Sequence, residues 1–360
     1  MAEKISAPKG TYDILPRDQP VRLWVEGRAA DVFRRYGYGR LDTPMFEETR
    51  LFARGVGEST DIVRKEMYTF QDMGGRSMTL RPEGTAPAAR AYVEHGMHTW
   101  PQPVKLWYHW PMFRYESPQS GRYRQHWQFG IEAFGSDSPV LDAEVIGVLA
   151  TLYDDIGLAQ VELRLNSMGC RECRPDYVAR LRAFLEDRKG ELCKDCRERA
   201  TLNPLRTFDC KVEGCRAVME QAPRLIDWLC PACAEHHAVV QRHLELQGIA
   251  YLPDHRLVRG MDYYTRTTFE FQSAVLGAQS GVGGGGRYDD LVETIGGPPT
   301  PGVGFRNGSR THPSGIGAFP RRPAHGRGTD RLPSRPHRRG PGTGLPAGPR
   351  APPAGGRGGA

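Results

Sequence analysis

The chain has 360 residues, 39% of them hydrophobic and 25% charged, a composition typical of a globular protein with two or three domains. It contains no apolar run of 18 residues, which excludes a transmembrane helix, and the first residues lack the apolar segment of a secretory signal. We therefore expect a cytoplasmic protein without a membrane partner.

The net charge of +7 is unevenly distributed. Residues 306–360 contain eleven Arg, no Lys and one acid, Asp330, and so carry +10, which leaves −3 for residues 1–305. A basic net charge by itself indicates a nucleic-acid partner. Here the charge belongs to the C-terminal segment, so it says little about the folded part.

Residues 1–164 show helical and strand-like patterns, and we take them as the first part of a core domain. A helix is predicted at 21–36 from its apolar spacing, and another at 142–156 with Asp142 as its N-cap. Strands are predicted from aromatic and β-branched residues at 39–44, 65–70, 77–81, 104–116 and 123–134. Because turns rather than helices separate most of these strands, an antiparallel sheet is expected.

The next two segments differ from each other. Residues 165–250 are helix-rich and contain every cysteine of the chain, whereas residues 251–305 return to strands, with a predicted strand at 267–271 and a Gly-rich turn at 282–286. The simplest layout is a helical insertion between two parts of one domain. The predicted fold class is α+β, an antiparallel sheet flanked by helices.

The eight cysteines form four close pairs, three of them C-x2-C and one C-x4-C: Cys170/Cys173, Cys193/Cys196, Cys210/Cys215 and Cys230/Cys233. Nineteen residues separate the first two pairs, a spacing that suits a four-thiolate zinc site, and fourteen separate the last two. Pairing in chain order would give two structural zinc sites that use all eight thiols. The alternative is a set of small buried or partly reduced cysteines without metal.

Residues 306–360 are rich in Gly, Pro and Arg and keep no apolar period. Such a segment cannot bury enough surface to offset its conformational entropy, so we predict a disordered tail. A basic nucleic-acid-binding arm is one interpretation. Translation in a shifted reading frame is the other.

Several polar residues stand out in the strand-like segments. Arg114 and Arg122 lie in a hairpin that could face a polyanion, since the guanidinium pairs with phosphate through two hydrogen bonds. Glu83 follows a proline, and Glu132 lies in an otherwise apolar strand, where a carboxylate either faces solvent or holds a cationic ligand. For each of these residues alone, an ordinary exposed surface is the competing interpretation.

Two further clusters lie near the end of the core. Residues 257–266 place Arg259 before a glycine and then two adjacent tyrosines, Tyr263 and Tyr264. Residues 283–286 are four glycines in a row, which permit close backbone approach to a ligand but match neither the P-loop nor the dinucleotide fingerprint.

Taken together, these segments resemble the histidyl-tRNA synthetases, a class II aminoacyl-tRNA synthetase family, over residues 5–305. The matching stretches are KGTYDILP, the motif-1-like RLDTPMFEETRLFARGVGESTDIVRKEMYTF, TLRPEGTAPAARAYVEHG, the motif-2-like FRYESPQSGRYRQHWQFGIEAFG, the histidine-specific LVRGMDYYTRTTFE, and GGGGRYDDL. The resemblance implies a class II catalytic core in residues 1–164 and 251–305, with residues 165–250 inserted.

The resemblance also implies roles for individual residues. The expected histidine-binding residues are Glu83, Gly84, Thr85, Gln128, Glu132, Tyr263, Tyr264 and Tyr288. Glu83 suits the ammonium group, and Glu132 with a tyrosine hydroxyl suits the two ring nitrogens. The expected ATP-binding residues are Arg114, Glu116, Arg122 and Arg259, with Arg114 and Arg259 on either side of the α-phosphate as the catalytic cations.

The expected reaction joins histidine and ATP, with Mg²⁺, into histidyl-adenylate and then transfers histidine to the 3′ end of its tRNA. A homodimer through motif 1, near Pro44, is also implied. The alternative is the synthetase-like regulatory subunit of ATP phosphoribosyltransferase in histidine biosynthesis. That relative has generally lost the catalytic residues, which are present here.

The resemblance stops after Phe305. The family continues into motif 3 and an anticodon-binding domain, whereas here Arg306, Asn307 and an Arg/Pro/Gly-rich sequence follow. We interpret residues 306–360 as the product of a frameshift. This chain is then expected to lack motif 3 and the anticodon-binding domain, and Arg306 is not assumed to replace the motif 3 arginine.

Overall fold

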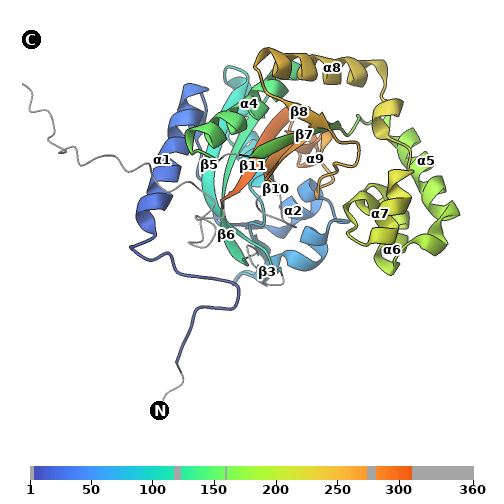
Figure 1. Cartoon of the computed structure of the whole chain (residues 1–360). Helices are drawn as coiled ribbons and strands as arrows, with labels where there is room; N and C mark the ends of the chain where they lie inside the picture. The colour runs from blue at the N-terminus through green and yellow to red at the C-terminus, as the bar shows by residue number, and fades with distance from the viewer. Residues whose placement is uncertain (1–3, 117–122, 159, 274–280, 310–360) are drawn as a thin grey trace, which may run out of the picture. The chain divides into compact units, whose positions relative to one another are not determined.

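The structure is a computed structural model that describes residues 4–116, 123–158, 160–273 and 281–309, with side chains up to Asn307. An eight-stranded sheet forms its centre (Figure 1). In spatial order the strands are β1 (Gly39–Arg40), β5 (Val104–Phe113), β6 (Gln125–Phe134), β11 (Gly302–Ser309), β10 (Gly281–Arg287), β9 (Thr265–Ser273), β7 (Val161–Ser167) and β8 (Tyr251–Pro253). The strand pairs are antiparallel except at the two edges, where β1 pairs with β5 and β8 with β7 in parallel. The expected antiparallel α+β core is therefore confirmed.

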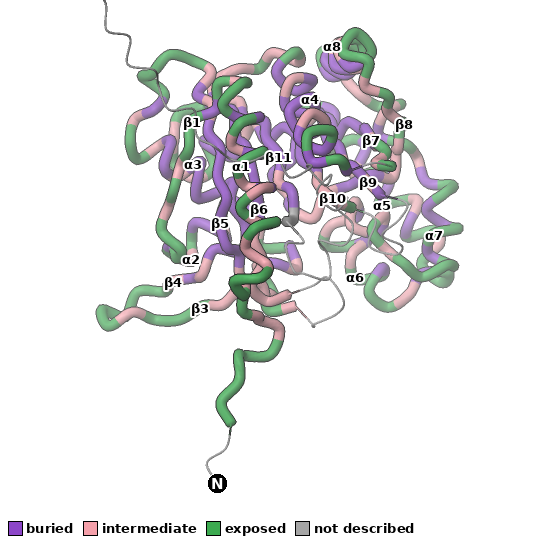
Figure 2. Tube along the Cα trace, turned by 60° about the vertical axis from the view of Figure 1, so that its left-hand side comes forward, coloured by how far each residue is buried: buried purple, intermediate pink, exposed green. Residues whose placement is uncertain are grey.

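One face of the sheet packs against α1 (Gln19–Arg35), α4 (Pro139–Asp155) and α8 (Pro231–Leu246). Every second residue of a strand points to the same face, and β6 shows the pattern: Phe129, Ile131 and Ala133 lie in the apolar core with α1 and α4. Buried residues accordingly gather in the central strands and along α4 (Figure 2). Because this core fixes the alternation, the intervening residues face the other side.

The opposite side carries shorter elements. They are β2 (Phe46–Glu48), α2 (Thr49–Val56), a helical turn at Ile62–Glu66, β3 (Tyr68–Gln71), β4 (Ser77–Leu80), α3 (Thr85–Glu94), a turn at Met97–Thr99 and α9 (Leu291–Thr294). The strands β2, β4 and β3 form a separate three-stranded antiparallel sheet. A second apolar core joins α2, α3 and α9 to the main sheet.

Residues between β7 and α8 form the helical insertion. It contains α5 (Arg174–Asp187), α6 (Lys194–Leu202) and α7 (Glu213–Glu220), with short helical turns at Lys189–Glu191, Pro204–Asp209 and Leu225–Trp228. Its own apolar cluster includes Leu181, Leu185 and two cysteines, Cys196 and Cys215. The boundaries at 164/165 and 250/251 remain a prediction. None of the helices in the described ranges is long and apolar enough to cross a bilayer.

Three sequence-based expectations differ from the structure. Helix α4 begins at Pro139 after Ser138, not at Asp142, because a proline suits the first turn. The segment 62–66 is helical, so the strand expected at 65–70 begins at Tyr68. The predicted Gly-rich turn at 282–286 lies instead within strand β10, where a Cβ at Gly285 would collide with the backbone of β11. In addition, β11 runs to Ser309, so the boundary predicted at Phe305 lies inside a strand.

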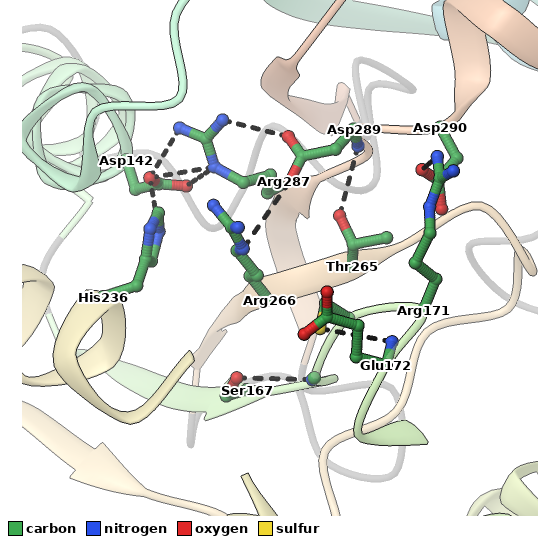
Figure 3. A network of polar contacts seen from close by, with 12 residues as sticks. Asp142, Ser167, Arg171, Glu172, His236, Thr265, Arg266, Arg287, Asp289 and Asp290 are labelled. Carbon is green, nitrogen blue, oxygen red and sulfur yellow. Dashed lines mark hydrogen bonds and ion pairs between the residues drawn. The ribbon is translucent and has the colours of Figure 1, made fainter. Parts of the chain in front are cut away.

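Asp142 has a structural role in place of capping. It is fully buried and accepts hydrogen bonds from the Arg287 guanidinium at 2.8 and 3.1 Å, and it lies 3.0 Å from Nε2 of His236 (Figure 3). Burial opposes the charge of Asp142, but the Arg287 and His236 partners outweigh it and lower the pKa of the carboxyl. Since Arg287 also binds Asp289, this network ties α4, α8 and the end of β10 together.

Candidate active site

The candidate site lies on the sheet face opposite α1, α4 and α8. The alternation in β6 that sends Phe129 and Ile131 into the apolar core places Gln128 and Glu132 on this face. On the neighbouring strand β11, Gly304 pairs with Glu132, and a Cβ there would collide with the Glu132 carboxylate. The glycine is therefore needed for a carboxylate to lie at the base of the site.

Glu132 is bound by three hydroxyl groups that come from α3, from β5 and from the segment after β10. Thr85 Oγ1 donates to Oε1 at 2.8 Å, Tyr108 donates to the same oxygen at 3.0 Å, and Tyr288 donates to Oε2. Burial raises the pKa of Glu132 to about 8, although these hydroxyl donors work against the rise. In its ionised form the carboxylate offers about four acceptor positions, so one then remains for a further donor.

Glu83 lies at the N-terminus of α3. Its carboxylate is fully buried and accepts the backbone N–H groups of Thr85 and Ala86, both at 2.8 Å. Unpaired N–H groups and the positive end of the helix dipole stabilise an anion at this place. The Tyr263 hydroxyl approaches to 3.5 Å. A buried anion held in this way is suited to a cationic ligand.

Three tyrosines surround the two carboxylates. The ring of Tyr263 lies 4.7 Å from that of Tyr264 and 5.7 Å from that of Tyr288, centroid to centroid. Burial raises the pKa values of Tyr263 and Tyr288 well above the ordinary range, so both phenols stay protonated and can donate. Gly84 lies so close to the Tyr108 ring that a side chain would not fit there. The structure thus brings the predicted residues 83–85, 132, 263, 264 and 288 together.

The predicted cations come from two other segments. Arg114, just after β5, donates from Nε to the Pro82 carbonyl at 2.8 Å and lies 3.9 Å from Glu116. Arg259, in the loop between β8 and β9, pairs with Glu270 at 2.6 Å. Burial lowers the pKa of Arg114, and the neighbouring charge of Arg306 lowers it further. Burial also opposes the charge of Arg259, but Tyr264 and Glu270 together raise its pKa.

Three polar atoms at this site are buried and have no hydrogen-bond partner among the described residues: Arg114 Nη2, Gln128 Oε1 and Arg259 Nε. Buried polar groups in folded proteins nearly always have a partner, so each such atom calls for an explanation. Two cationic donors and one amide acceptor on the same face are suited to a ligand with both anionic and N–H groups.

Arg306 lies on the site-facing side of β11, where the positions before it are glycines. The site-facing positions before it on β11 are Gly302 and Gly304, so Arg306 supplies the first long side chain on this stretch of the strand. Its Nη1 lies 3.2 Å from Met261 Sδ, which is a weak acceptor. Its charge acts on Arg114, His126 and Tyr263, which places a third cation near the site.

Sequence reasoning missed Tyr108 and Glu270. Tyr108 lies opposite Gly130 in the β5–β6 pair, and this glycine leaves room for the ring to reach Glu132. Predicting that contact would have required the register of the two strands, which the sequence pattern does not determine. Glu270 alternates with the buried Phe269 and Phe271, a pattern that could have assigned it to the site face. Arg122 lies outside the described residues.

The eight cysteines gather in two groups, but not in chain order. Cys170 and Cys173 meet Cys230 and Cys233, while Cys193 and Cys196 meet Cys210 and Cys215; in each group all four Sγ atoms lie within 4.8 Å of one another. The pairing in chain order was wrong because α5 carries the chain away from the first pair and α8 begins beside it. All eight thiols are free.

Comparisons with known proteins show the family of this chain. The sequence pattern of the family described as "Histidyl-tRNA synthetase" matches residues 10–308. A histidine–tRNA ligase of Desulforudis audaxviator is 56% identical over 304 residues, which cover 84% of this chain and 72% of that protein. One from Desulforamulus reducens is 54% identical over 301 residues, with the same coverage. The crystal structure of apo histidyl-tRNA synthetase from S. aureus superposes with a TM-score of 0.71 at 37% identity, covering 88% of this chain and 74% of that chain. The chain therefore belongs to the histidyl-tRNA synthetase family.

Proposed function

We propose that this chain activates histidine with ATP and that histidyl-adenylate formed here is the donor for the 3′ end of the cognate tRNA. One observation supports this above all. Two buried carboxyl groups, Glu83 and Glu132, lie beside phenol hydroxyls. Two half-buried cations, Arg114 and Arg259, lie on the same sheet face, and each has one buried nitrogen without a hydrogen-bond partner among the described residues. An amino acid with a basic side chain and a polyphosphate together complement such a pocket.

In the proposed binding mode, Glu83 holds the α-ammonium group and Glu132 faces the imidazole. The bound ring favours ionisation of Glu132, whose carboxylate then accepts one ring N–H in its remaining acceptor position. A Tyr264 or Gln128 group serves the other ring nitrogen. A site that pairs both nitrogens discriminates strongly against other amino acids, because its buried groups would lose their partners. Gly84 leaves room for the Tyr108 ring, whose hydroxyl reaches Glu132.

In the proposed reaction, the histidine carboxylate attacks the α-phosphorus of ATP in line, and pyrophosphate leaves with the electron pair of the broken P–O bond. Arg114 and Arg259 are the candidate groups that offset the negative charge of the transition state. Arg259 is held in place by Glu270, and Arg114 by the Pro82 carbonyl. Members of this family use ATP with Mg²⁺, and Mg²⁺ neutralises charge on the leaving pyrophosphate; Glu116, beside Arg114, is the candidate residue to hold it.

The alternative function, a regulatory subunit of ATP phosphoribosyltransferase, has less support. A non-catalytic relative has no need of the half-buried cations at Arg114 and Arg259. Both residues are present here, and each has a positioning partner.

We also propose a homodimer through the motif 1 region. The three-stranded sheet beside Pro44 exposes a group of large apolar side chains: Met45 is 54% exposed, Phe46 49% and Phe70 43%. Exposed apolar groups of this kind are typical of protein interfaces. A cytoplasmic location follows from the proposed use of ATP and tRNA. We also propose zinc as a resident metal of the two cysteine groups.

Calorimetric titration of the whole chain tests the proposed pocket. L-Histidine is expected to bind, and histidine methylated on either ring nitrogen is expected to bind at least about 100-fold more weakly, because one buried partner is then left unpaired. Glu83→Gln is expected to lower the affinity at least about 10-fold, whereas Glu162→Gln, an exposed change on β7, should not alter it. Equal affinity for histidine and both methylated forms would contradict the proposed pocket.

A further inference from the structure

The two cysteine groups have the dimensions of single-ion sites. Sulfur atoms about 2.3 Å from a tetrahedral zinc ion lie about 3.8 Å from one another. In the outer group, defined as Cys170, Cys173, Cys230 and Cys233, Sγ of Cys170 lies 3.8 Å from Sγ of both Cys173 and Cys230. In the inner group, defined as Cys193, Cys196, Cys210 and Cys215, the Cys193–Cys210 distance is 3.9 Å. These distances are far from a disulfide bond of about 2.05 Å.

Backbone N–H groups point at the sulfur atoms. In the outer group, the Cys170 N–H donates to Cys173 Sγ at 3.3 Å, and the Glu172 N–H donates to Cys170 Sγ at 3.4 Å. In the inner group, the Cys193 N–H donates to Cys215 Sγ at 3.2 Å. Such donors favour thiolates over thiols and orient the ligands around a metal. Four thiolates in a tetrahedral arrangement are a donor set typical of zinc.

The outer group lies directly beside the loop that carries the pocket tyrosines. The Arg266 N–H donates to the Gly169 carbonyl at 2.7 Å, and the Met168 N–H donates back to the Arg266 carbonyl, so this segment pairs with the residues just before Cys170. Arg266 has a φ of 44°, a left-handed conformation that a non-glycine residue rarely adopts without external support. Arg171 binds Asp290, which adds a contact from the same turn to the segment after β10 (Figure 3).

Arg174 links this turn to Tyr264. Its Nε donates to the Met168 carbonyl at 2.9 Å, and its Nη2 donates to the Tyr264 carbonyl. Arg197 has the corresponding position in the inner group, since it also follows the second cysteine of a C-x2-C pair and its Nε also donates to a backbone carbonyl, that of Leu192 at 2.8 Å. Leu192 lies within the insertion. The two arginines are thus matched in sequence, but Arg174 reaches the pocket segment and Arg197 holds the insertion.

From this arrangement we propose that each group binds one zinc ion and that the outer zinc fixes the backbone of Tyr264–Arg266, and thereby one wall of the candidate pocket. The outer site closes the insertion at its two ends, between the end of β7 and the start of α8. The inner site lies within that loop and holds α6 and α7 together. This inference concerns the chain's own backbone and does not depend on the proposed histidine binding.

Elemental analysis of the full chain, purified without chelator, tests the identity and number of the bound metal ions. Two zinc ions per chain are expected. The double variants Cys173→Ser/Cys233→Ser and Cys196→Ser/Cys215→Ser should each retain one. Zinc well below one per chain in the unaltered protein, or iron in place of zinc, would overturn the proposal.

Hydrogen exchange measured by mass spectrometry tests the link to the pocket. Loss of the outer site by Cys173→Ser/Cys233→Ser is expected to speed exchange of the Met168 and Arg266 amides at least about tenfold, because their pairing is no longer held. Loss of the inner site should change the exchange rates of both amides by less than about twofold. Unchanged exchange at Arg266 after loss of the outer zinc would overturn the proposed coupling.

A second pair of variants keeps the test decisive if the cysteine variants do not fold. Arg174→Met should retain two zinc ions and yet speed exchange of the Tyr264–Arg266 segment. Arg197→Met, its matched control, should retain two zinc ions and leave that segment unchanged. The same effect from both variants, or from neither, would contradict the specific path through Arg174.

Discussion

Replacing Glu132 with Gln should change how the stability of the chain depends on pH. Burial raises the pKa of this carboxyl from an ordinary value of 4.5 to about 8. Between these values the unfolded chain has released the proton and the folded chain still holds it. The free energy of unfolding therefore falls as pH rises from about 4.5 to about 8 and changes no further above that range.

The magnitude follows from the size of the shift. One pKa unit corresponds to about 1.4 kcal/mol, so Glu132 costs the folded state up to roughly 5 kcal/mol at pH 8 compared with pH 4.5. Glutamine has nearly the same shape and does not titrate. Glu132→Gln should therefore gain stability relative to the unaltered chain as pH rises, by several kcal/mol across this range.

Urea unfolding followed by circular dichroism, at pH 5, 6.5 and 8, measures this difference. The difference in unfolding free energy between the variant and the unaltered chain should grow with pH in favour of the variant. Glu162→Gln, the exposed change on β7, controls for the loss of a carboxylate from the same sheet. A difference that is the same at pH 5 and pH 8 would refute the reasoning, because Glu132 would then titrate alike in the folded and unfolded chains.

Three further predictions follow from other contacts. Asp142→Asn should lower the free energy of unfolding by about 3 kcal/mol at pH 7, because it removes the buried counter-charge of Arg287 and leaves Asp289 as its remaining acidic partner. Since the pKa of Asp142 is lowered, this loss should shrink as pH falls below about 4, and urea unfolding at pH 7 and below pH 4 checks it. Gly84→Ala should lower the free energy of unfolding by about 1–3 kcal/mol, because the added methyl group collides with Tyr108. Gly27→Ala, whose methyl group meets open space, should not lower it. Equal melting temperatures for the two variants would contradict this prediction. Arg306→Ala should weaken binding of pyrophosphate several-fold and reduce its dependence on salt, measured by calorimetry, because one of three cations is lost; unchanged binding would place Arg306 outside the anion site.

The sequence predicted the general fold because its signals are local. The apolar spacing of 21–36 predicted α1, and the aromatic stretches at 104–116 and 123–134 predicted β5 and β6, within a few residues of their observed ends. The prediction of a turn from the glycines at 283–286 was wrong for a physical reason. Glycine is usual in turns, but here it is required by close contact between strands. Likewise, Asp142 resembled a helix cap, while its actual partner, Arg287, lies far away in the chain.

The candidate site was predicted through resemblance, and the structure adds contacts that residue patterns do not contain. Glu83 and Glu132 were each unremarkable as isolated acids, and their environment became clear only with the helix N-terminus and the hydroxyl groups in place. The pairing of the cysteines could not be read from spacing, since pairs far apart in sequence meet when helices carry the chain back. The register between strands and the meeting of distant cysteine pairs both depend on the tertiary structure, which residue patterns do not determine.

The most direct test of the central claim is exchange of labelled pyrophosphate into ATP by the whole 360-residue chain. The expected result is exchange that requires histidine, that glutamine and phenylalanine do not support, and that is lost in Arg259→Ala. Exchange that is independent of the amino acid supplied, or no exchange from a folded chain that binds both histidine and ATP, would contradict the proposal that these residues activate histidine.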